Sequence, residues 1–499
     1  MSSFTFIDLF AGCGGFSLGL RAAGGKDLLA VEKSPMAAMT YYHNFLKRFE
    51  CHENPRILKS HWNDLLHQSN KRLKAQSSSE VRLIVDDIWK VLEDKDLLKT
   101  IKDQQPDVVV GGPPCQGFSL AGLRKGKEDQ RNQLVHAFRK FIVATEPKMI
   151  VMENVQGIRL RFDEGGNSPI EEVIKFFEDG EGKKGEPIYK VQRLELNAKH
   201  YGVPQNRPRV VLIGVRQDLA EDIEFLPRFL FSGTDSAELM PEIKEETYTV
   251  EEALLGLPLE SGVEGAETKR KRTNQYIRSL AGLQGDDDLT PCPKREKIAN
   301  HTFRDHHPHT RKRFGLYQQL AKLESDWINE EWLNSKVFEQ LQEEKNAPHP
   351  FGNKDSNPFE MLRKMLTGPT KRLVTVKIFE GGEKEQKIKT ADELEVVMKE
   401  LLTSKQTQRV LKSGQEAPTM LTIPDDYVHP EDPRTLTVRE IARLQSFPDK
   451  FEFVGKETTG GDNRKSEVPQ YTQVGNAVPP LLAKAIGLKV KQILKRLGK

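Results

Sequence analysis

The first part of the chain alternates short apolar runs with stretches of helical periodicity. The apolar runs between residues 4 and 216 have the length and the β-branched content of buried strands. They are Phe4–Leu9, Leu28–Val31, Leu83–Val85, Val108–Val110, Met149–Met152, Tyr189–Leu196 and Val210–Val215. Helical patterns such as Pro35–Phe49 and Asn132–Thr145 lie between them. Strands that alternate with helices indicate βαβ units and a parallel sheet, so the pattern predicts an α/β fold.

The pattern changes near residue 225 and returns near residue 417. Turn residues, charge clusters and histidines replace the regular alternation, as in Ser261–Gly265 and Glu380–Glu383. After this segment, Thr437–Gln445 and Leu481–Leu497 again have helical periodicity. We therefore expect one domain over residues 1–224 and a second, irregular domain over 225–417. Residues 418–499 are expected to return to the first domain, with the last helix covering the first strand.

The composition is typical of a globular chain. The 499 residues are 37% hydrophobic and 30% charged, with a formal net charge of +3. No run approaches the ~18 apolar residues that a membrane span needs, and no secretory signal is recognisable. The four cysteines are too few and too scattered for a disulfide framework, which favours a reducing cytoplasm. The small net charge neither requires nor excludes a nucleic-acid partner, because local basic clusters matter more than the total.

A cysteine follows one of the predicted strands on a stiff turn. The sequence Gly111-Gly112-Pro113-Pro114-Cys115-Gln116 overlaps the end of the Val108–Val110 run and continues beyond it. The prolines restrict the backbone before the thiol, and the glycines permit a ligand to approach closely. Reactive groups of open α/β sheets lie at the carboxyl ends of strands, so Cys115 is a candidate nucleophile. The loop alone is equally compatible with redox and hydrolytic chemistry.

The first predicted strand leads into a glycine-rich turn. Phe10-Ala11-Gly12-Cys13-Gly14-Gly15 precedes a helical stretch, and a strand, a glycine turn and a helix form nucleotide or nucleoside pockets. The dinucleotide fingerprint is incomplete because Ser17 occupies its third glycine position, and a tight structural turn is the alternative. Glu32 ends the next strand, where a carboxylate holds ribose hydroxyls. Asp86-Asp87-Ile88 follows Leu83–Val85, where a carboxylate accepts from adenine. Because no second phosphate-binding feature is present, S-adenosylmethionine fits this pattern better than NAD.

Two further segments carry polar groups near predicted strand ends. Glu153-Asn154-Val155 follows the strand expected beside the one that precedes Cys115. A carboxyl group beside a thiol serves as an acid or as a hydrogen-bond partner to a substrate ring, with a helix N-cap or a solvated strand end as the alternative. Gln205, Arg207 and Arg209 alternate along an extended segment and therefore share one face. Two guanidiniums and an amide suit an anionic or carbonyl-bearing substrate, with a surface ion-pair network as the alternative.

Together these segments resemble the DNA (cytosine-5) methyltransferase family of the bacterial restriction-modification type. The resemblance rests on motifs that occur in the family's order. They are Phe10–Gly15, Pro113–Gln116, Glu153–Val155, Gln205–Arg209, Arg434–Pro448 and Gly475–Pro479. The resemblance covers residues 1–216 and 415–499, and the segment between them corresponds to the family's variable target-recognition domain. It implies a Rossmann-like, adenosylmethionine-dependent methyltransferase catalytic domain and a smaller, irregular mixed target-recognition domain.

The resemblance also implies roles for individual residues. Cys115 is the expected nucleophile at carbon 6 of a flipped cytosine, and Glu153 is expected to contact ring nitrogen 3 and the amino group. Arg207 and Arg209 are expected to support the nucleophile loop and the base, with Arg209 nearer the base. The expected cofactor shell consists of Phe10, Gly12, Gly14, Glu32, Lys33, Asp87, Ile88, Pro114, Asn476 and Val478. Lys33 departs from the family pattern, which has an aromatic residue against the adenine, and its stem replaces only part of that contact.

The implied activity is methyl transfer from S-adenosylmethionine to carbon 5 of cytosine in a specific duplex DNA sequence. We expect a monomer that protects DNA beside a cognate restriction endonuclease. The alternatives are a tRNA cytosine-5 methyltransferase, a non-catalytic DNA-binding regulator and, more distantly, a Rossmann oxidoreductase. The length of segment 225–417 favours DNA over tRNA, and the presence of both Cys115 and Glu153 argues against a regulator.

A group of histidines and arginines lies within the irregular segment. His301, Arg304, His306, His307, His309 and Arg311–Arg313 are candidates for contacts with DNA phosphates. The alternatives are packing at the domain junction and a histidine-ligated metal. Because the chain has no CxxC pair and the histidine spacing fits no standard site, we expect no metal.

Overall fold

The computed structural model describes residues 3–46, 83–114, 132–159, 168–179, 188–220, 223, 230–231, 241–244, 247–260, 270–283, 298–327, 376–380, 384–388, 396, 408–461, 463 and 466–498. An eight-stranded mixed sheet has the order β3-β2-β1-β4-β5-β7-β6-β8. Its strands are β1 (Phe4–Leu9), β2 (Gly25–Glu32), β3 (Leu83–Val85), β4 (Val108–Gly111), β5 (Met149–Val155), β6 (Tyr189–Asn197), β7 (Pro208–Arg216) and β8 (Leu230–Phe231). The strands predicted from the apolar runs are therefore confirmed, with bounds that differ by a few residues.

The prediction of an all-parallel sheet is wrong on one side of the sheet. Strands β3, β2, β1, β4 and β5 run parallel to one another. Strand β7 instead lies antiparallel between β5 and β6. The connection from β6 to β7 contains only the 3-10 turn η2 (Ala198–Tyr201) and an extended segment, which is too short to hold a crossover helix. The sheet is of the predicted α/β, Rossmann-like class with an antiparallel end.

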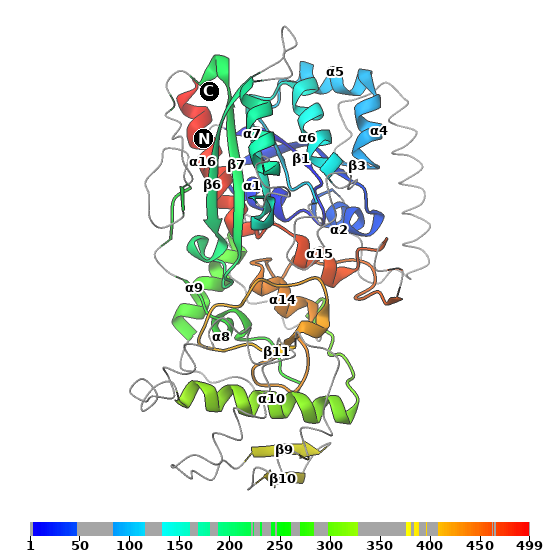
Figure 1. The fold of residues 1–499 in the computed structure, drawn as a ribbon, viewed down its shortest axis with the longest axis vertical. Coiled ribbons are helices and arrows are strands. Elements are labelled where there is room, and N and C mark those ends of the chain that lie inside the picture. Colours follow the sequence, from blue (N-terminus) through cyan, green and yellow to red (C-terminus); the bar gives the residue numbers. More distant parts are fainter. Residues whose placement is uncertain are drawn as a thin grey trace.

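Helices cover both faces of this sheet (Figure 1). One face packs against α1 (Gly15–Ala22) and α16 (Pro480–Arg496). The other packs against α4 (Ile88–Glu93), α5 (Lys95–Asp103), α6 (Asn132–Thr145) and α7 (Pro169–Asp179). The alternation of a strand appears in β4, where Val108 and Val110 face the first group of helices and Val109 faces the second. Helix α2 (Pro35–Phe45) follows β2, and the predicted helix beyond residue 46 lies outside the described residues.

The last helix returns to the first strand-helix unit, as predicted. Helices α1 and α16 pack so closely that a Cβ atom on Gly19 would lie 2.4 Å from the Ala483 Cβ and 2.4 Å from the Pro480 carbonyl oxygen. Gly487 of α16 lies against Ala23 and Leu20 in the same way. The small residues therefore allow residues 480–496 to cover the first strand and to complete the core of this face.

A second group of elements lies beyond one edge of the sheet (Figure 1). Its helices are α8 (Val250–Leu254), α9 (Arg270–Ala281), α10 (Pro308–Trp327), α14 (Val438–Leu444) and α15 (Gln470–Asn476). Its short strand pairs are β9 (Val376–Glu380) with β10 (Lys384–Ile388), and β11 (Arg409–Val410) with β12 (Tyr427–Val428). The remaining 3-10 turns are η1 (Gln156–Arg159), η3 (Gln217–Leu219) and η7 (Pro424–Asp426). Within the described part of the chain, no helix is long and apolar enough to cross a membrane.

One apolar core joins the two groups of elements. Tyr248 and Tyr276, which lie in the irregular segment, belong to the same cluster as Phe16 of α1, Leu481 of α16 and Leu444 of α14. Tyr276 also donates a hydrogen bond to the carbonyl oxygen of Arg443. Residues 247–260 and 270–283 are thus packed against residues 436–453, while the division at residues 224 and 417 stays a prediction.

Candidate active site

The turn that leads to Cys115 lies beside β5. Strands β4 and β5 are parallel and Gly111 pairs with Met152, which places residues 112–114 next to Glu153 and Asn154. The Asn154 side-chain Nδ2 donates to the carbonyl oxygen of Pro113 at 3.1 Å, and both groups are buried. The predicted juxtaposition of this turn with the carboxylate is therefore present. Cys115 itself lies outside the described residues, which end here at Pro114.

Glu153 is part of the sheet and does not follow the strand, which corrects the predicted end of this strand at Met152. It is a residue of β5, where it pairs with Val211 of β7. Its Oε1 atom lies 2.9 Å from Nε of Arg209, and the two side chains are only 11% and 8% exposed. Burial lowers the pKa of Arg209, and Glu153 opposes that effect. Glu153 is therefore neither a helix N-cap nor a solvated strand end, the two alternatives that the sequence left open for it.

The second carboxylate oxygen of Glu153 is turned towards the nucleophile turn. A Cβ atom on Gly112 would lie 3.4 Å from the Glu153 Oε2 atom. The backbone of Gly112 is therefore adjacent to this carboxylate. The arrangement presents a charged hydrogen-bonding group, fixed by Arg209, beside the backbone that carries Cys115.

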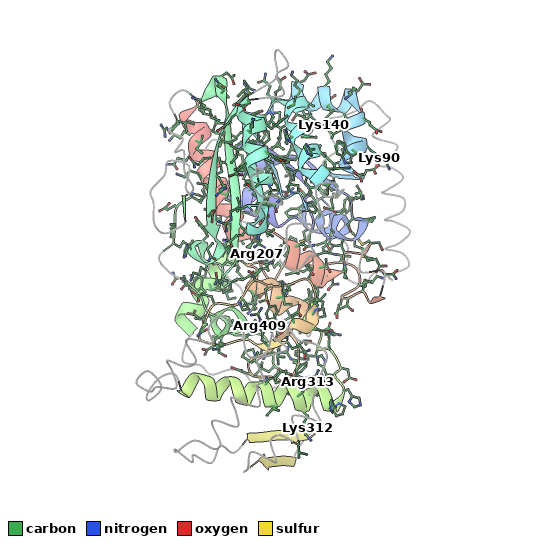
Figure 2. All side chains as sticks on the ribbon, in the orientation of Figure 1. Lys90, Lys140, Arg207, Lys312, Arg313 and Arg409 are labelled. Carbon is green, nitrogen blue, oxygen red and sulfur yellow. The ribbon has the colours of Figure 1, made fainter. Side chains whose placement is uncertain are left out.

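Gln205, Arg207 and Arg209 are buried, so the alternative of a surface ion-pair network is excluded for them. Gln205 donates from Nε2 to the Leu444 carbonyl oxygen and to the Gln445 side chain. Arg207 donates from Nη2 to the carbonyl oxygens of Gly475 and Ala477 at 3.0 and 3.1 Å. Figure 2 shows Arg207 near the lower end of the sheet, close to α15 as labelled in Figure 1. The prediction that it supports the nucleophile loop falls on residues outside the described part of the chain.

The glycine-rich turn adopts the strained conformation that its sequence suggests. Phe10, Gly12 and Gly14 all have positive φ angles, of 58°, 56° and 98°. The Gly12 N–H donates to Glu32 Oε2 at 2.8 Å, and the Ser34 N–H donates to Glu32 Oε1 at 2.6 Å. Burial raises the pKa of Glu32, and these backbone donors oppose the increase. Glu32 thus ties the turn after β1 to the turn after β2.

A nucleoside fits this cradle. Among the described residues, no heavy atom lies within 4 Å of the position that a Cβ atom on Gly12 would take. Helix α1 begins directly after the turn, and its first turn, Gly15–Leu18, carries no acidic residue. On the far side, the Val478 carbonyl oxygen would lie 2.4 Å from a Cβ on Gly15, so the predicted C-terminal contacts meet the glycine turn. The predicted residues from both ends of the chain therefore gather at one place.

Lys33 contacts the carboxylate predicted to bind adenine. Its Nζ lies 2.8 Å from Asp87 Oδ2, with side-chain exposures of 75% and 27%. Asp87 also caps α4, because its Oδ1 accepts from the Trp89 N–H at 3.1 Å. Burial opposes ionisation, but the hydrogen bond from Lys33 leaves the pKa of Asp87 lowered. Ile88, which begins α4, is buried beside this pair.

Two of the candidate phosphate-binding histidines, His301 and His306, contact protein groups. His301 contacts Thr437 Oγ1 and the Pro258 carbonyl oxygen, both at 2.9 Å. His306 contacts the Thr435 hydroxyl at 3.2 Å. Arg304 pairs with Asp425, and Arg311 pairs with Glu260. The observed contacts agree with the alternative of packing, here of residues 258–260 and 301–311 against residues 425–437.

Buried arginines of the Arg434–Pro448 motif are structural residues that the sequence did not identify. Arg434 donates to both carboxylate oxygens of Glu440 at 2.8 Å, and Thr437 and Glu440 form a capping box at the start of α14. Arg439 donates to three carbonyl oxygens, those of Ala299, Pro448 and Phe451. The Thr-x-x-Glu spacing is a capping-box signature from which this helix start is predictable, whereas nothing in the sequence indicates the acceptors of Arg439.

Comparisons with known proteins agree with this geometry. The model of the C-5 cytosine-specific DNA methylase family matches residues 4–68 and 70–492. The Type II methyltransferase M1.HphI of Haemophilus parahaemolyticus is 30% identical over 97% of this chain and 86% of its own length. The Type II methyltransferase M.DdeI of Desulfomicrobium norvegicum is 29% identical over 97% of this chain and 88% of its own length.

A solved structure has the same fold. A putative DNA modification methyltransferase encoded within a prophage of E. coli superposes with a TM-score of 0.52 at 22% identity, covering 99% of both chains. The family model spans nearly the whole chain, including the segments that hold Glu153, Arg209 and the 475–478 residues. The chain therefore belongs to the C-5 cytosine-specific DNA methylase family, the family that its ordered motifs resemble.

Proposed function

We propose that this chain transfers a methyl group from S-adenosylmethionine to carbon 5 of a cytosine that has been flipped out of duplex DNA, through a covalent adduct at Cys115. The observation that carries the proposal is the contact of the nucleophile turn with β5. Asn154 holds the Pro113 carbonyl oxygen, and Glu153 lies beside Gly112 with Arg209 as its partner. This contact supports a site in which the thiol and the carboxylate act on opposite parts of one ring.

The ring requires covalent activation because carbon 5 of cytosine is a poor nucleophile. A free thiol has a pKa of about 8.5, so Cys115 must lose its proton before or during attack. The thiolate then forms a bond to carbon 6, and the electron pair of the 5,6 double bond becomes available at carbon 5. Glu153 shares a proton with ring nitrogen 3 and so offsets the negative charge that reaches it, and Arg209 keeps the Glu153 side chain in place. After carbon 5 is methylated, loss of its proton expels the thiolate and restores the double bond.

S-adenosylmethionine supplies the methyl group as a sulfonium. The residues proposed to hold it are Phe10, Gly12, Gly14, Glu32, Lys33, Asp87, Ile88, Pro114, Asn476 and Val478. Glu32 is suited to the ribose because it is already fixed by two backbone donors and retains acceptor capacity. Asp87 is suited to the adenine amino group, for which Lys33 is a competing partner.

The macromolecular substrate is proposed to be duplex DNA. Extrusion of the base costs a few kcal/mol, and segment 225–417 is proposed to hold the DNA during this step. The Type II names of the relatives support a role in a restriction-modification system, with a cognate endonuclease acting on the same sequence. We propose a cytoplasmic monomer.

The test is methyl transfer by the purified full chain. Tritiated S-adenosylmethionine is incubated with plasmid DNA and, separately, with total tRNA, and bisulfite sequencing then locates the modified cytosines. The proposal predicts label in 5-methylcytosine of DNA at one short sequence, and none after Cys115→Ser. Label in tRNA alone, label in DNA with undiminished rate in Cys115→Ser, or no transfer to either substrate would overturn it.

A further inference from the structure

Asn476 and Val478, two predicted contacts of the cofactor, lie in a turn whose carbonyl groups accept hydrogen bonds from a distant side chain. Helix α15 ends at Asn476 and α16 begins at Pro480, so residues 475–478 span the end of α15 and the start of the connection to α16. The last carbonyl groups of a helix have no partner within it. Residues after a helix usually donate their N–H groups to these carbonyls. Here the Ala477 N–H donates to the Val474 carbonyl oxygen, but Pro479 and Pro480 have no N–H to donate. The 475–478 turn therefore needs donors from elsewhere in the chain.

Arg207 supplies two of those donors, beside Gln445, whose Nε2 donates to the carbonyl oxygens of Val474 and Gly475 at 2.8 and 3.4 Å. Its Nη2 atom lies 3.0 Å from the Gly475 carbonyl oxygen and 3.1 Å from the Ala477 carbonyl oxygen, on either side of Asn476. Its Nη1 atom donates to Gln205 Oε1 at 3.4 Å, and Met420 O lies at the 3.5 Å limit of a hydrogen bond. A guanidinium at the carboxyl end of α15 also has the favourable sign for the helix dipole. Arg207 thus caps α15 with a charged side chain.

The burial of this guanidinium indicates a specific requirement for it. Arg207 is 2% exposed, and among the described residues it has no carboxylate partner within ion-pair distance. Burial lowers its pKa, and neighbouring Arg209 acts in the same direction. A buried charge without a carboxylate partner costs stability even when carbonyl groups surround it. Residues kept at such a cost are expected at functional sites.

The opposite side of the 475–478 turn contacts the glycine-rich turn. A Cβ atom on Gly15 would lie 2.4 Å from the Val478 carbonyl oxygen and 3.2 Å from the Ala477 Cβ. On a third side, a Cβ atom on Gly475 would lie 2.5 Å from the Leu421 carbonyl oxygen. The turn is therefore held between Arg207, residues 421–422 and the start of α1, with no space for a larger residue at Gly475 or Gly15. A displacement on the Arg207 side would be passed to the cofactor cradle.

We propose that Arg207 is a positioning residue for the cofactor cradle, which sets the affinity for S-adenosylmethionine through the 475–478 turn and not through contact with the flipped base. This inference rests on the proposed function and assigns the two arginines of the Gln205–Arg209 segment to different tasks. Arg209 fixes Glu153 at the base, whereas Arg207 fixes the turn at the cofactor. A misplacement of about 1 Å at such a site reduces function by as much as 100-fold.

Arg207→Lys is the informative substitution. Lysine keeps the charge but lacks the planar fork that reaches both carbonyl groups at once. We expect the Kd for S-adenosylhomocysteine to rise at least roughly tenfold, and the KM for S-adenosylmethionine to rise in parallel. The kcat at saturating cofactor should fall by less than about threefold, because Glu153 and Arg209 are untouched. Arg209→Lys should show the reverse split, with a reduced kcat and an unchanged Kd.

The matched control is Arg439→Lys. Arg439 is also fully buried and also donates to backbone carbonyl oxygens, but its acceptors are Ala299, Pro448 and Phe451. It should lower the thermal midpoint about as much as Arg207→Lys and leave the Kd for S-adenosylhomocysteine unchanged. A purely structural role of Arg207 would affect the two variants alike.

The experiment is calorimetric titration of the purified full chain with S-adenosylhomocysteine, combined with thermal melts. If Arg207→Lys does not fold, Gly475→Ala displaces the same turn from the Leu421 side and should weaken binding in the same way. Wild-type affinity in a folded Arg207→Lys protein, or an equal loss in Arg439→Lys, overturns the inference alone. Absence of binding to the wild-type chain overturns the proposed function as well.

Discussion

The buried pair of Glu153 and Arg209 provides a quantitative test of the active-site geometry. We consider Glu153→Gln, Arg209→Gln and the double variant. At the observed 2.9 Å separation, two unit charges attract by about 6 kcal/mol when the effective dielectric constant is about 20. Desolvation of both groups offsets much of this attraction, since their side chains are only 11% and 8% exposed.

Removal of one partner leaves the other charge buried and uncompensated. This typically costs about 3 kcal/mol or somewhat more. Unfolding entropy of about 2 cal/mol/K per residue gives about 1 kcal/mol/K for the 499-residue chain. Each single variant should therefore melt about 3 °C below the wild type, or lower still if the sheet domain unfolds separately. The double variant should fall by no more than either single variant, because no stranded charge remains.

The assay is scanning calorimetry of the three variants and the wild type at pH 7.5 in dilute buffer. A double-mutant cycle then isolates the coupling between the two side chains. A double variant whose midpoint falls by the sum of the two single shifts would show that the side chains do not interact. That result would refute the placement of Glu153 by Arg209.

Three other predictions concern parts of the molecule away from this pair. Gly19→Ala places a Cβ atom 2.4 Å from the Pro480 carbonyl oxygen. The cost of overpacking, about 1–3 kcal/mol, should exceed the gain in helix propensity of about 1 kcal/mol, so the thermal midpoint should fall. An increase in the midpoint would contradict the packing of α1 on α16. Burial lowers the pKa of His301 and of His306, that of His306 to about 4. Because the folded-state pKa lies below the unfolded value, the stability contributed by the neutral imidazole is present above pH 6.5 and is lost as the pH falls towards 4. The midpoint should therefore decline between pH 6.5 and 4.5, less steeply in His306→Asn, whereas an equal slope would exclude His306 as a cause. Burial raises the pKa of Cys13 to about 12, so peptide mapping after N-ethylmaleimide treatment of the native protein at pH 7.5 should leave Cys13 unlabelled, and rapid labelling would contradict its burial.

The sheet was largely predictable because parallel strands buried on both faces read as continuous apolar runs. The runs at Val108–Val110 and Leu83–Val85 contain little else, and their strands were located to within a residue. The direction of β7 was not predictable in this way. Its apolar pattern is equally compatible with either direction, and only the short connection through Ala198–Tyr201 excludes a parallel crossover.

The candidate site was predictable in its residue types but not in its contacts. The apolar run ends at Met152, so the sequence predicts Glu153 beyond the strand, but Glu153 pairs with Arg209 inside β5. Arg207 was grouped with Arg209 because the two alternate along one segment. Its acceptor Gly475 is 268 positions away in the chain, so no local pattern reveals it.

The histidines near residue 301 show the same limit. Clustered histidines and arginines are compatible with phosphate binding, yet His301 and His306 contact residues more than 120 positions later in the chain. Such long-range packing cannot be read from spacing in a segment without periodicity.

The covalent role of Cys115 is the central claim, and adduct trapping tests it most directly. The purified full chain is incubated with S-adenosylmethionine and plasmid DNA whose cytosines are replaced by 5-fluorocytosine, because the fluorine prevents proton loss from carbon 5 and blocks release of the thiol. The account predicts a protein–DNA adduct that survives denaturation and maps by mass spectrometry to the peptide containing Cys115, and no adduct in Cys115→Ser. An adduct at another residue, or none with the wild-type enzyme while it methylates ordinary DNA, would contradict the account.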